Sequence, residues 1–254
     1  MNNTIEDMEQ KTNYLFGMHP VFEAISAGKN IEKVLLKKGL TGEQFQQLFS
    51  LLQEKQIAFQ FVPVEKLDKI TRARHQGVIA MIPSVDYVTL ENAVEKAFAK
   101  KENPLFLMLD GVSDVRNFGA IARSAECAGV DCIILPAKGG ASITPDAIKT
   151  SAGALLRIDV CKVPNLKTAV FYLQQSDVQI VTATEKAEGY LYDADLTGAT
   201  AIVMGAEDKG VSDPIRKLAN AEAKIPMAGN IGSLNVSAAA SVILYEAVRQ
   251  RITK

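Results

Sequence analysis

The chain contains 254 residues with a formal net charge of −1, and 48% of its residues are hydrophobic. This length predicts one or two domains with a sizeable core, and no apolar run in the sequence is long enough to span a membrane. The near-zero net charge neither indicates nor excludes an RNA partner, because a basic face can exist within a neutral protein.

The cysteine and histidine content argues against a metal site. Cys127, Cys132 and Cys161 form no CxxC pair, and His19 and His75 are the only histidines. We therefore expect no structural zinc and no catalytic metal, and we interpret the cysteines as buried free thiols of a reducing compartment.

Residues 1–83 predict a leader followed by a small domain. Residues 1–13 are polar and lack the basic and apolar regions of a signal peptide, which indicates a flexible leader on a cytoplasmic protein. Residues 14–83 alternate between strand-like and helix-like patterns and predict a small α/β domain with its own core. We expect strands at 14–17, 33–36, 59–62 and 78–82, and helices at 19–27 and 41–55.

A larger α/β domain is predicted at 104–254, after a linker and connecting helix at 84–103. Thr89 is placed to cap the connecting helix at 90–99. Strands separated by helices indicate a mostly parallel sheet that is covered on both faces. We expect strands at 105–110, 132–135, 158–163, 179–184 and 201–205 and a short one ending at 225, and helices at 120–128, 146–152, 166–175 and 235–251.

Three glycine-bearing stretches in this domain lie where a strand gives way to a loop, at 109–129, 202–210 and 225–241. Such an arrangement builds a ligand crevice at the carboxyl ends of parallel strands. Neither GxGxxG nor GxxxxGK[ST] occurs, and Glu207 and Asp208 stand where a phosphate would bind, so the ligand is not rich in phosphate.

S-adenosylmethionine fits these loops better, because it combines an adenosine and an amino-acid tail with a cationic sulfonium and has no phosphate. Gly205, Ile225 and Leu234 are candidate backbone contacts for it. A single glycine at a strand end indicates only a turn. The placement of glycines at three successive strand ends is what favours a binding site.

Polar residues flank the two helices that follow the first and third stretches. Asn117 is a natural N-cap for a helix starting near Phe118, and Arg123 lies more than one turn into that helix. Taken alone, such an arginine is typical of a solvated surface, and Ser233 and Asn235 are typical of the cap of the final helix.

Read together, the motifs NFGAIAR (117–123), GAEDKG (205–210) and IPMAGNIGSLNVS (225–237) resemble those of the SpoU, or TrmH, family of RNA ribose 2′-O-methyltransferases. FGMHPVFEAI (16–25) and HQGVIA (75–80) resemble the N-terminal substrate-binding domain of the bacterial large-subunit rRNA guanosine 2′-O-methyltransferases in that family. The resemblance implies a SPOUT-type trefoil knot in the parallel sheet, a small RNA-binding domain similar to a ribosomal-protein fold, and a homodimer with its active site near the subunit contact.

The resemblance also implies roles for residues. The catalytic set is Asn117, Arg123, Glu207, Ser233 and Asn235. The contacts with S-adenosylmethionine are Thr182, Ala183, Thr184, Met204, Gly205, Ile225, Met227 and Leu234.

The substrate is expected to be RNA, with large-subunit rRNA favoured. Arg116 occupies a position where relatives often have His, and it is a candidate phosphate contact or an ordinary exposed arginine. The other candidate RNA contacts are Lys37, Lys38, Arg72, Arg74 and His75, for which an ordinary solvated surface is the alternative.

Three other functions stay open at this point. They are the same chemistry on tRNA or on another rRNA site, a non-catalytic RNA-binding protein of ribosome assembly, and a dehydrogenase. The intact catalytic set argues against the second, and the missing pyrophosphate loop argues against the third.

Overall fold

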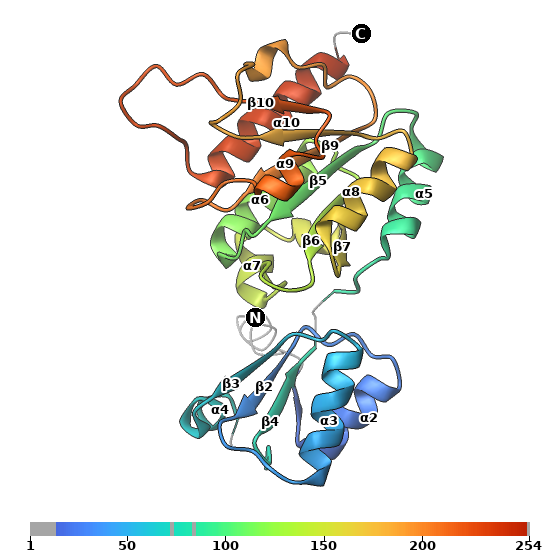
Figure 1. The fold of residues 1–254 in the computed structure, drawn as a ribbon, viewed down its shortest axis with the longest axis vertical. Helices are drawn as coiled ribbons and strands as arrows, with labels where there is room; N and C mark the ends of the chain where they lie inside the picture. The colour runs from blue at the N-terminus through green and yellow to red at the C-terminus, as the bar shows by residue number, and fades with distance from the viewer. Residues whose placement is uncertain (1–13, 72–73, 83–84, 253–254) are drawn as a thin grey trace, which may run out of the picture. The chain divides into compact units, whose positions relative to one another are not determined.

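The computed structural model describes residues 14–71, 74–82 and 85–252, which divide into two compact units (Figure 1). The first unit runs to Asp86 and includes the segment Ser142–Pro145, and the second comprises Tyr87–Ala141 and the chain from Asp146. The predicted boundary at residue 83, the predicted leader at 1–13 and Arg72 lie outside the described residues.

The first unit is a four-stranded sheet in the order β1-β4-β2-β3. Strands β2 and β3 are parallel, and β4 is antiparallel to both of its neighbours. The strands are β1 (Tyr14–Phe16), β2 (Lys33–Lys37), β3 (Phe59–Val62) and β4 (Val78–Met81). The helices are α2 (Met18–Ser26), α3 (Glu43–Glu54) and α4 (Val64–Ile70).

Alternate residues of β2 and β4 serve two hydrophobic cores, because successive side chains of a strand point to opposite faces. Leu36 packs with α2 and α3 on one face, while Leu35 packs with Leu67 of α4 on the other. The predicted strands and two helices are confirmed to within two residues at each end. Helix α4 was not predicted, since seven residues are too few to show a helical period.

The second unit contains a six-stranded, fully parallel sheet in the order β10-β8-β9-β5-β6-β7. Its strands are β5 (Leu105–Asp110), β6 (Cys132–Pro136), β7 (Asp159–Val163), β8 (Gln179–Ala183), β9 (Thr200–Gly205) and β10 (Ala221–Ala223). Its helices are α5 (Leu90–Lys100), α6 (Val115–Cys127), α7 (Pro145–Thr150), α8 (Leu166–Gln175), α9 (Asp213–Arg216) and α10 (Val236–Ile252), with short 3-10 turns η1 (Ala154–Leu156) and η2 (Leu191–Asp193).

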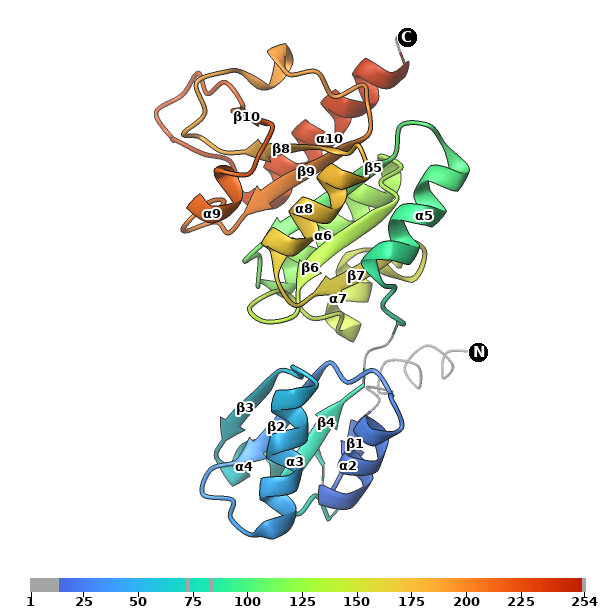
Figure 2. The same ribbon diagram turned by 45° about the vertical axis from the view of Figure 1, so that its right-hand side comes forward.

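Helices cover both faces of this sheet, as the sequence predicts (Figures 1 and 2). Helices α5, α8 and α9 share one hydrophobic core with the sheet, and α6 and α10 pack side by side on the other face. Thr89 caps α5 as predicted, since its Oγ1 accepts a hydrogen bond from the Asn92 amide at 3.2 Å. None of the described helices has the length and apolarity that a membrane crossing requires.

The chain direction across the sheet reverses between β5 and β9, since β6 and β7 lie on one side of this pair and β8 and β10 on the other. In open parallel sheets, ligands bind outside the carboxyl ends of the strands at such a switch point. The ends of β5 and β9 meet here, with Asp110 paired to Gly205 in register. The first two glycine-bearing stretches therefore leave the sheet side by side.

Two expectations about this unit are wrong in detail. Helix α6 starts at Val115, five residues before the predicted 120, and Asp114 rather than Asn117 is its N-cap, accepting the Asn117 amide at 2.8 Å. Among the cysteines, Cys132 and Cys161 are buried free thiols, but Cys127 at the end of α6 is exposed. Burial raises the pKa of Cys161 to about 12 and also raises that of Cys132, so both thiols are unreactive.

Candidate functional site

The carboxyl ends of three neighbouring strands form the floor of a cavity in the second unit. Ala183 of β8 lies in register with Met204 of β9 and with Ala223 of β10. All three residues line a cavity of about 440 Å³, a size within the usual range for small-molecule sites. The segment from 225 to 236, which leads from β10 to α10, contributes much of the remaining wall.

Seven of the eight residues assigned to the cofactor by resemblance line this cavity: Ala183, Thr184, Met204, Gly205, Ile225, Met227 and Leu234. Thr182 does not line it. Its side chain is fully buried, and Oγ1 lies 3.4 Å from Oε1 of Glu222 on β10. Thr182 therefore joins two strands beneath the cavity instead of contacting its contents.

Gly205 is required by the close approach of a second chain segment. A Cβ atom at this position would lie 1.9 Å from the carbonyl carbon of Gly210 and 2.0 Å from the nitrogen of Val211. The loop that starts at Ala206 thus folds back across the end of β9, and the Gly210 amide donates to the Ala206 carbonyl at 2.7 Å. Only glycine leaves room for this crossing.

Three polar side chains of the predicted catalytic set meet beside the cavity. The side-chain amide of Asn235 donates to Oδ1 of Asn117 at 3.1 Å and to Oε1 of Glu207 at 3.3 Å. The side-chain amide of Asn117 donates to Oε2 of Glu207, also at 3.3 Å. Glu207 lines the cavity, so this cluster of Asn117, Glu207 and Asn235 joins the cavity wall to α6 and α10.

Asn235 also caps α10. Its Oδ1 accepts hydrogen bonds from the amide and the hydroxyl of Ser237, at 2.9 and 2.6 Å. The sequence offered capping and catalysis as alternatives for this residue, and its geometry satisfies the cap while aiming the amide nitrogen at Asn117 and Glu207.

The other catalytic candidates stand apart from that cluster. Ser233 is exposed on the cavity wall. Arg123 is exposed on α6, six residues after Asn117, which is about 9 Å along the helix and about 120° around it. Within the described part of the chain, Arg123 has no ion-pair or hydrogen-bond partner. Arg116 is exposed one heptad before Arg123, so both arginines project from the same side of α6.

Gly119 on α6 allows a neighbouring helix to pack closely. A Cβ atom there would lie 2.7 Å from Cβ of Thr150 and 2.9 Å from the Ala147 carbonyl oxygen. Helix α7 therefore packs directly on the backbone of α6 and fixes the position of its first turn, which carries Asn117.

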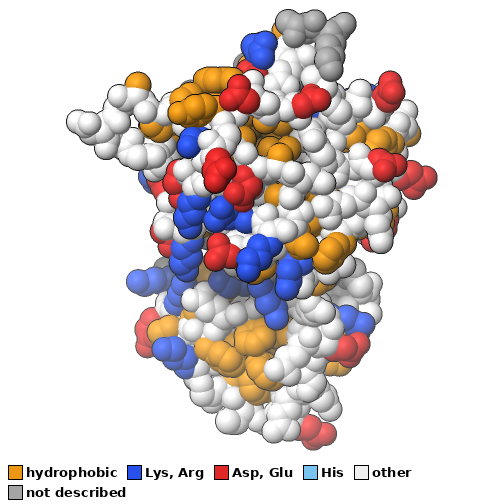
Figure 3. Space-filling model, turned by 45° about the horizontal axis from the view of Figure 1, so that its top comes forward, with side chains coloured by type: hydrophobic (Ala, Val, Ile, Leu, Met, Phe, Trp, Pro, Cys, Tyr) orange, Lys and Arg blue, Asp and Glu red, His pale blue; other side chains and the backbone are white. Residues whose placement is uncertain are grey.

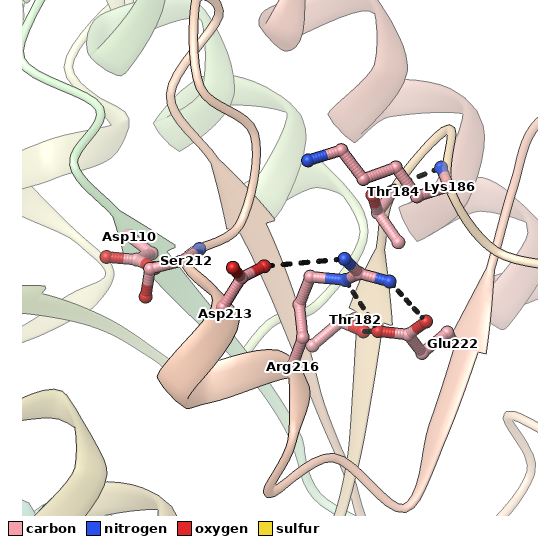
Figure 4. A network of polar contacts seen from close by, with 8 residues as sticks. All are labelled: Asp110, Thr182, Thr184, Lys186, Ser212, Asp213, Arg216 and Glu222. Carbon is pink, nitrogen blue, oxygen red and sulfur yellow. Dashed lines mark hydrogen bonds and ion pairs between the residues drawn. The ribbon is translucent and has the colours of Figure 1, made fainter.

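A second polar network, which the sequence did not reveal, braces the strands under the cavity (Figure 4). Arg216 of α9 binds Glu222 of β10 through two hydrogen bonds of 2.8 Å, and its Nη1 lies 3.6 Å from Asp213. The hydrogen bonds from Arg216 hold the pKa of Glu222 below its usual range. Because β10 leads into the segment 225–236 that lines the cavity, this ion pair fixes where that segment starts. A basic residue six positions before an acidic one on a short strand gives no local signal of such a contact.

Charges of both signs surround the cavity. Glu185, Lys186, Glu207, Asp208 and Lys209 all contribute to its lining. Three carboxylates among five charged groups suit a cationic ligand and oppose a polyphosphate. Among the described residues, no group of three or more His, Cys, Asp or Glu side chains is arranged to hold a metal ion.

The candidate RNA contacts of the first unit differ in their surroundings. Lys37, Lys38 and Arg74 are exposed. His75 is not a free contact, because Nδ1 accepts the Gly77 amide at 3.0 Å and Nε2 lies 2.9 Å from Oδ1 of Asp68. With its side chain only 12% exposed, His75 braces the turn before β4.

The shape and charge of the cavity fit S-adenosylmethionine. Its floor is made of apolar strand ends, and its lining includes the carboxylates of Glu185, Glu207 and Asp208, which favour a sulfonium.

Comparison with protein families agrees with this chemistry. Residues 104–245 match the SpoU rRNA Methylase family, and residues 14–88 match the family described as RNA 2′-O ribose methyltransferase substrate binding. The chain is 37% identical to the 23S rRNA (guanosine-2′-O-)-methyltransferase RlmB of Vibrio vulnificus, over 94% of this chain and 97% of that protein.

Solved structures show the same fold. The TrmH/SpoU tRNA modifying enzyme of A. aeolicus is 31% identical, with a TM-score of 0.56 over 65% of this chain and 85% of that one. The SpoU methyltransferase AviRb of Streptomyces viridochromogenes is 26% identical, with a TM-score of 0.59 over 94% and 90% of the two chains. AviRb has also been solved in complex with AdoMet. The chain therefore belongs to the SpoU rRNA methylase family and is an S-adenosylmethionine-dependent RNA 2′-O-methyltransferase.

Proposed function

We propose that this enzyme methylates the ribose 2′-hydroxyl of a guanosine in large-subunit rRNA. The observation that carries the proposal is the likeness to RlmB, which extends over 94% of this chain and so includes the substrate-binding unit as well as the methyltransferase unit. The likeness to the tRNA modifying enzyme of A. aeolicus reaches only 65% of this chain. An rRNA substrate in the cytoplasm is accordingly favoured over tRNA.

A trefoil knot is part of the same proposal. It is supported by the crossing at Gly205 and by backbone hydrogen bonds between the β8–β9 connection (184–199) and the residue that follows β10. Lys224, just after β10, donates its amide to the Gly189 carbonyl at 3.0 Å, and its own carbonyl accepts the Leu191 amide at 2.8 Å. The chain then continues through the cavity wall to α10, whose Arg251 donates to the carbonyls of Leu196 and Gly198 in the same connection.

The residue roles follow from charge and position. When bound, the cofactor supplies an electrophilic methyl group on a cationic sulfur. The cluster of Asn117, Glu207 and Asn235 orients the ribose at the cavity mouth, with Ser233 beside it. Arg123 stabilises the negative charge that develops on the ribose oxygen as its proton leaves, because a guanidinium stays protonated and is a poor base.

A homodimer accounts for the position of Arg123. Its side chain projects away from the cluster in its own chain and has no described partner. Tyr245 on the neighbouring α10 is 52% exposed, so this helix also offers a large aromatic side chain for a contact. We propose that α6 and α10 face a second copy, so that Arg123 completes the partner's active site.

The test is a methylation map. The purified enzyme, S-adenosylmethionine with a labelled methyl group, and total RNA should give label at one ribose of a guanosine in large-subunit rRNA. Label found only in tRNA would show that tRNA, and not rRNA, is the substrate. Binding of RNA without any methyl transfer would favour the non-catalytic alternative.

A further inference from the structure

Four phenylalanine rings cluster at the edge of the first unit's sheet. Phe45 and Phe49 come from α3, and Phe59 and Phe61 from β3. Phe61 meets Phe45 and Phe59 edge-on, with ring centroids 6.4 and 5.9 Å apart, and Phe59 meets Phe49 in the same way at 5.0 Å. This edge-to-face packing holds the ring of Phe61 in a fixed orientation.

Phe61 differs from the other three in exposure. Phe45, Phe49 and Phe59 are half-buried against the hydrophobic core between the sheet and α3, whereas Phe61 is 41% exposed. Strand β3 is the last strand in the order of its sheet, so no described strand covers its outer side. A rigid aromatic ring is therefore open to solvent at a sheet edge.

Two lysines lie at the end of β2, the strand that pairs with β3. Phe61 is paired in register with Leu36, and the ladder continues through the Lys38 amide, which donates to the Val62 carbonyl at 2.9 Å. Lys38 lies just past the end of β2, and this hydrogen bond keeps its backbone beside the residue that follows Phe61. Lys37 and Lys38 are exposed, and neither forms an ion pair with any residue in the described ranges. Figure 3 shows hydrophobic and basic side chains next to one another on one face of this unit.

We propose that Phe61 is a stacking platform for an unpaired base of the RNA substrate, with Lys38 binding an adjoining phosphate. An aromatic face beside an uncompensated cation matches a nucleotide, which offers a flat ring and a negative charge. The inference rests on the proposed function, because it takes the first unit as the part that binds RNA. It adds that this unit binds a single-stranded or looped segment through a base and not only through the phosphate chain.

Binding of full-length protein to two labelled probes tests the platform. One probe is an oligouridylate, and the other is an abasic ribose-phosphate oligomer of equal length. Phe61→Leu keeps the apolar bulk that covers the core but removes the aromatic face. We expect it to weaken binding of oligouridylate by about 5- to 150-fold, the effect of losing one stacked base, and to leave binding of the abasic oligomer unchanged. Phe61→Tyr should bind both probes like the wild type.

The matched control is Phe98→Leu, which alters a phenylalanine of similar exposure, 36%, on α5 of the other unit. It should change neither affinity. Lys38→Gln should lower affinity for both probes and reduce the salt dependence of binding by about one phosphate contact.

Equal affinities of wild-type and Phe61→Leu protein for oligouridylate would overturn the proposal that Phe61 stacks on a base. An equal loss of affinity for both probes would overturn it too. A change in oligomeric state caused by Phe61→Leu would instead identify the ring as a protein contact and also overturn it. Methyl transfer by the wild-type protein to total RNA is measured in parallel. Its absence would refute the proposed function, whereas normal transfer with unaltered probe binding by Phe61→Leu would refute only the platform.

Discussion

The side-chain amide of Asn235 lies 3.1 Å from Oδ1 of Asn117, although the two residues are 118 positions apart. The contact joins the first turn of α6 to the residue before α10, and Glu207 accepts a hydrogen bond from each asparagine. Three segments that leave different parts of the sheet are thereby held at one mouth of the cavity. Since Asn235 also caps α10, its Oδ1 serves the helix while its Nδ2 serves the contacts with Asn117 and Glu207.

Substituting Asn235→Asp should separate those two functions. Aspartate caps a helix as well as asparagine does, so the free energy of unfolding should fall by less than about 1 kcal/mol. The new carboxylate, however, replaces a donor 3.3 Å from Glu207 and repels it, so methyl transfer should fall by orders of magnitude. Thermal unfolding and single-turnover methyl transfer measure the two effects.

Asn235→Ala is the comparison for this prediction. It removes the cap as well as the amide, so it should lose about 1 kcal/mol of stability in addition to activity. Full activity of Asn235→Asp would mean that the amide donor has no part in the reaction.

Much of the fold could be predicted from the sequence, because its signals are local. Apolar runs such as Leu105–Asp110 mark strands, and Thr89 marks a helix start. Short elements and exact boundaries could not be predicted in this way. Residues 115–117 precede Phe118, the first buried position of α6, so the pattern of buried positions cannot show that they are helical, and Asp114 was missed as the cap.

The site depended on information of another kind. Parallel strand ends predict a crevice, and this much follows from topology rules. That Asn117, Glu207 and Asn235 touch one another follows from long-range packing, which residue patterns do not encode, and only the family resemblance grouped them. The same limit explains why the pair Arg216 and Glu222 was not foreseen and why Thr182 was assigned to the cofactor although it is buried beneath the cavity.

Gly205→Ala should damage both the fold and cofactor binding. The added Cβ would overlap the backbone at Gly210 and Val211, which cannot rotate away as a flexible side chain can. We expect a loss of at least about 3 kcal/mol in the free energy of unfolding, at the upper end of overpacking costs. Calorimetry should show that affinity for S-adenosylmethionine is lost in any protein that still folds.

Gly198→Ala provides the control for that substitution. A Cβ at 198 meets no heavy atom within 4 Å, and the residue's φ is outside the left-handed region. Its stability and cofactor affinity should match the wild type. Wild-type behaviour of Gly205→Ala would show that the crossing of the two segments is looser than the structure has it.

Arg123→Ala should retain affinity for S-adenosylmethionine and lose methyl transfer by orders of magnitude. The side chain is exposed and does not line the cavity, so cofactor binding does not need it. Its proposed role is to stabilise charge in the transition state, and removal of such a group lowers turnover more than binding. Calorimetry and single-turnover assays measure the two quantities.

Mixing two inactive variants tests whether Arg123 acts across a dimer. If it serves the partner's site, a mixed dimer of Arg123→Ala and Asn235→Asp chains contains one site with both native residues, and mixing restores activity. If each chain supplies its own arginine, every site in the mixture lacks one group and the mixture stays inactive.

Acid should weaken the fold partly through Glu222. Hydrogen bonds from Arg216 lower the pKa of this carboxyl in the folded protein, so its ionised form stabilises the fold above the unfolded value of about 4.3. That contribution is lost as the pH falls below this value and through the lower folded pKa. Urea unfolding from pH 7 to pH 3 should therefore show Glu222→Gln to be less stable than the wild type at pH 7, with the gap closing in acid. Arg216→Gln removes the cause of the shift and should also flatten the acid dependence, whereas curves that run parallel to the wild type over the whole range would show that this ion pair does not contribute to stability.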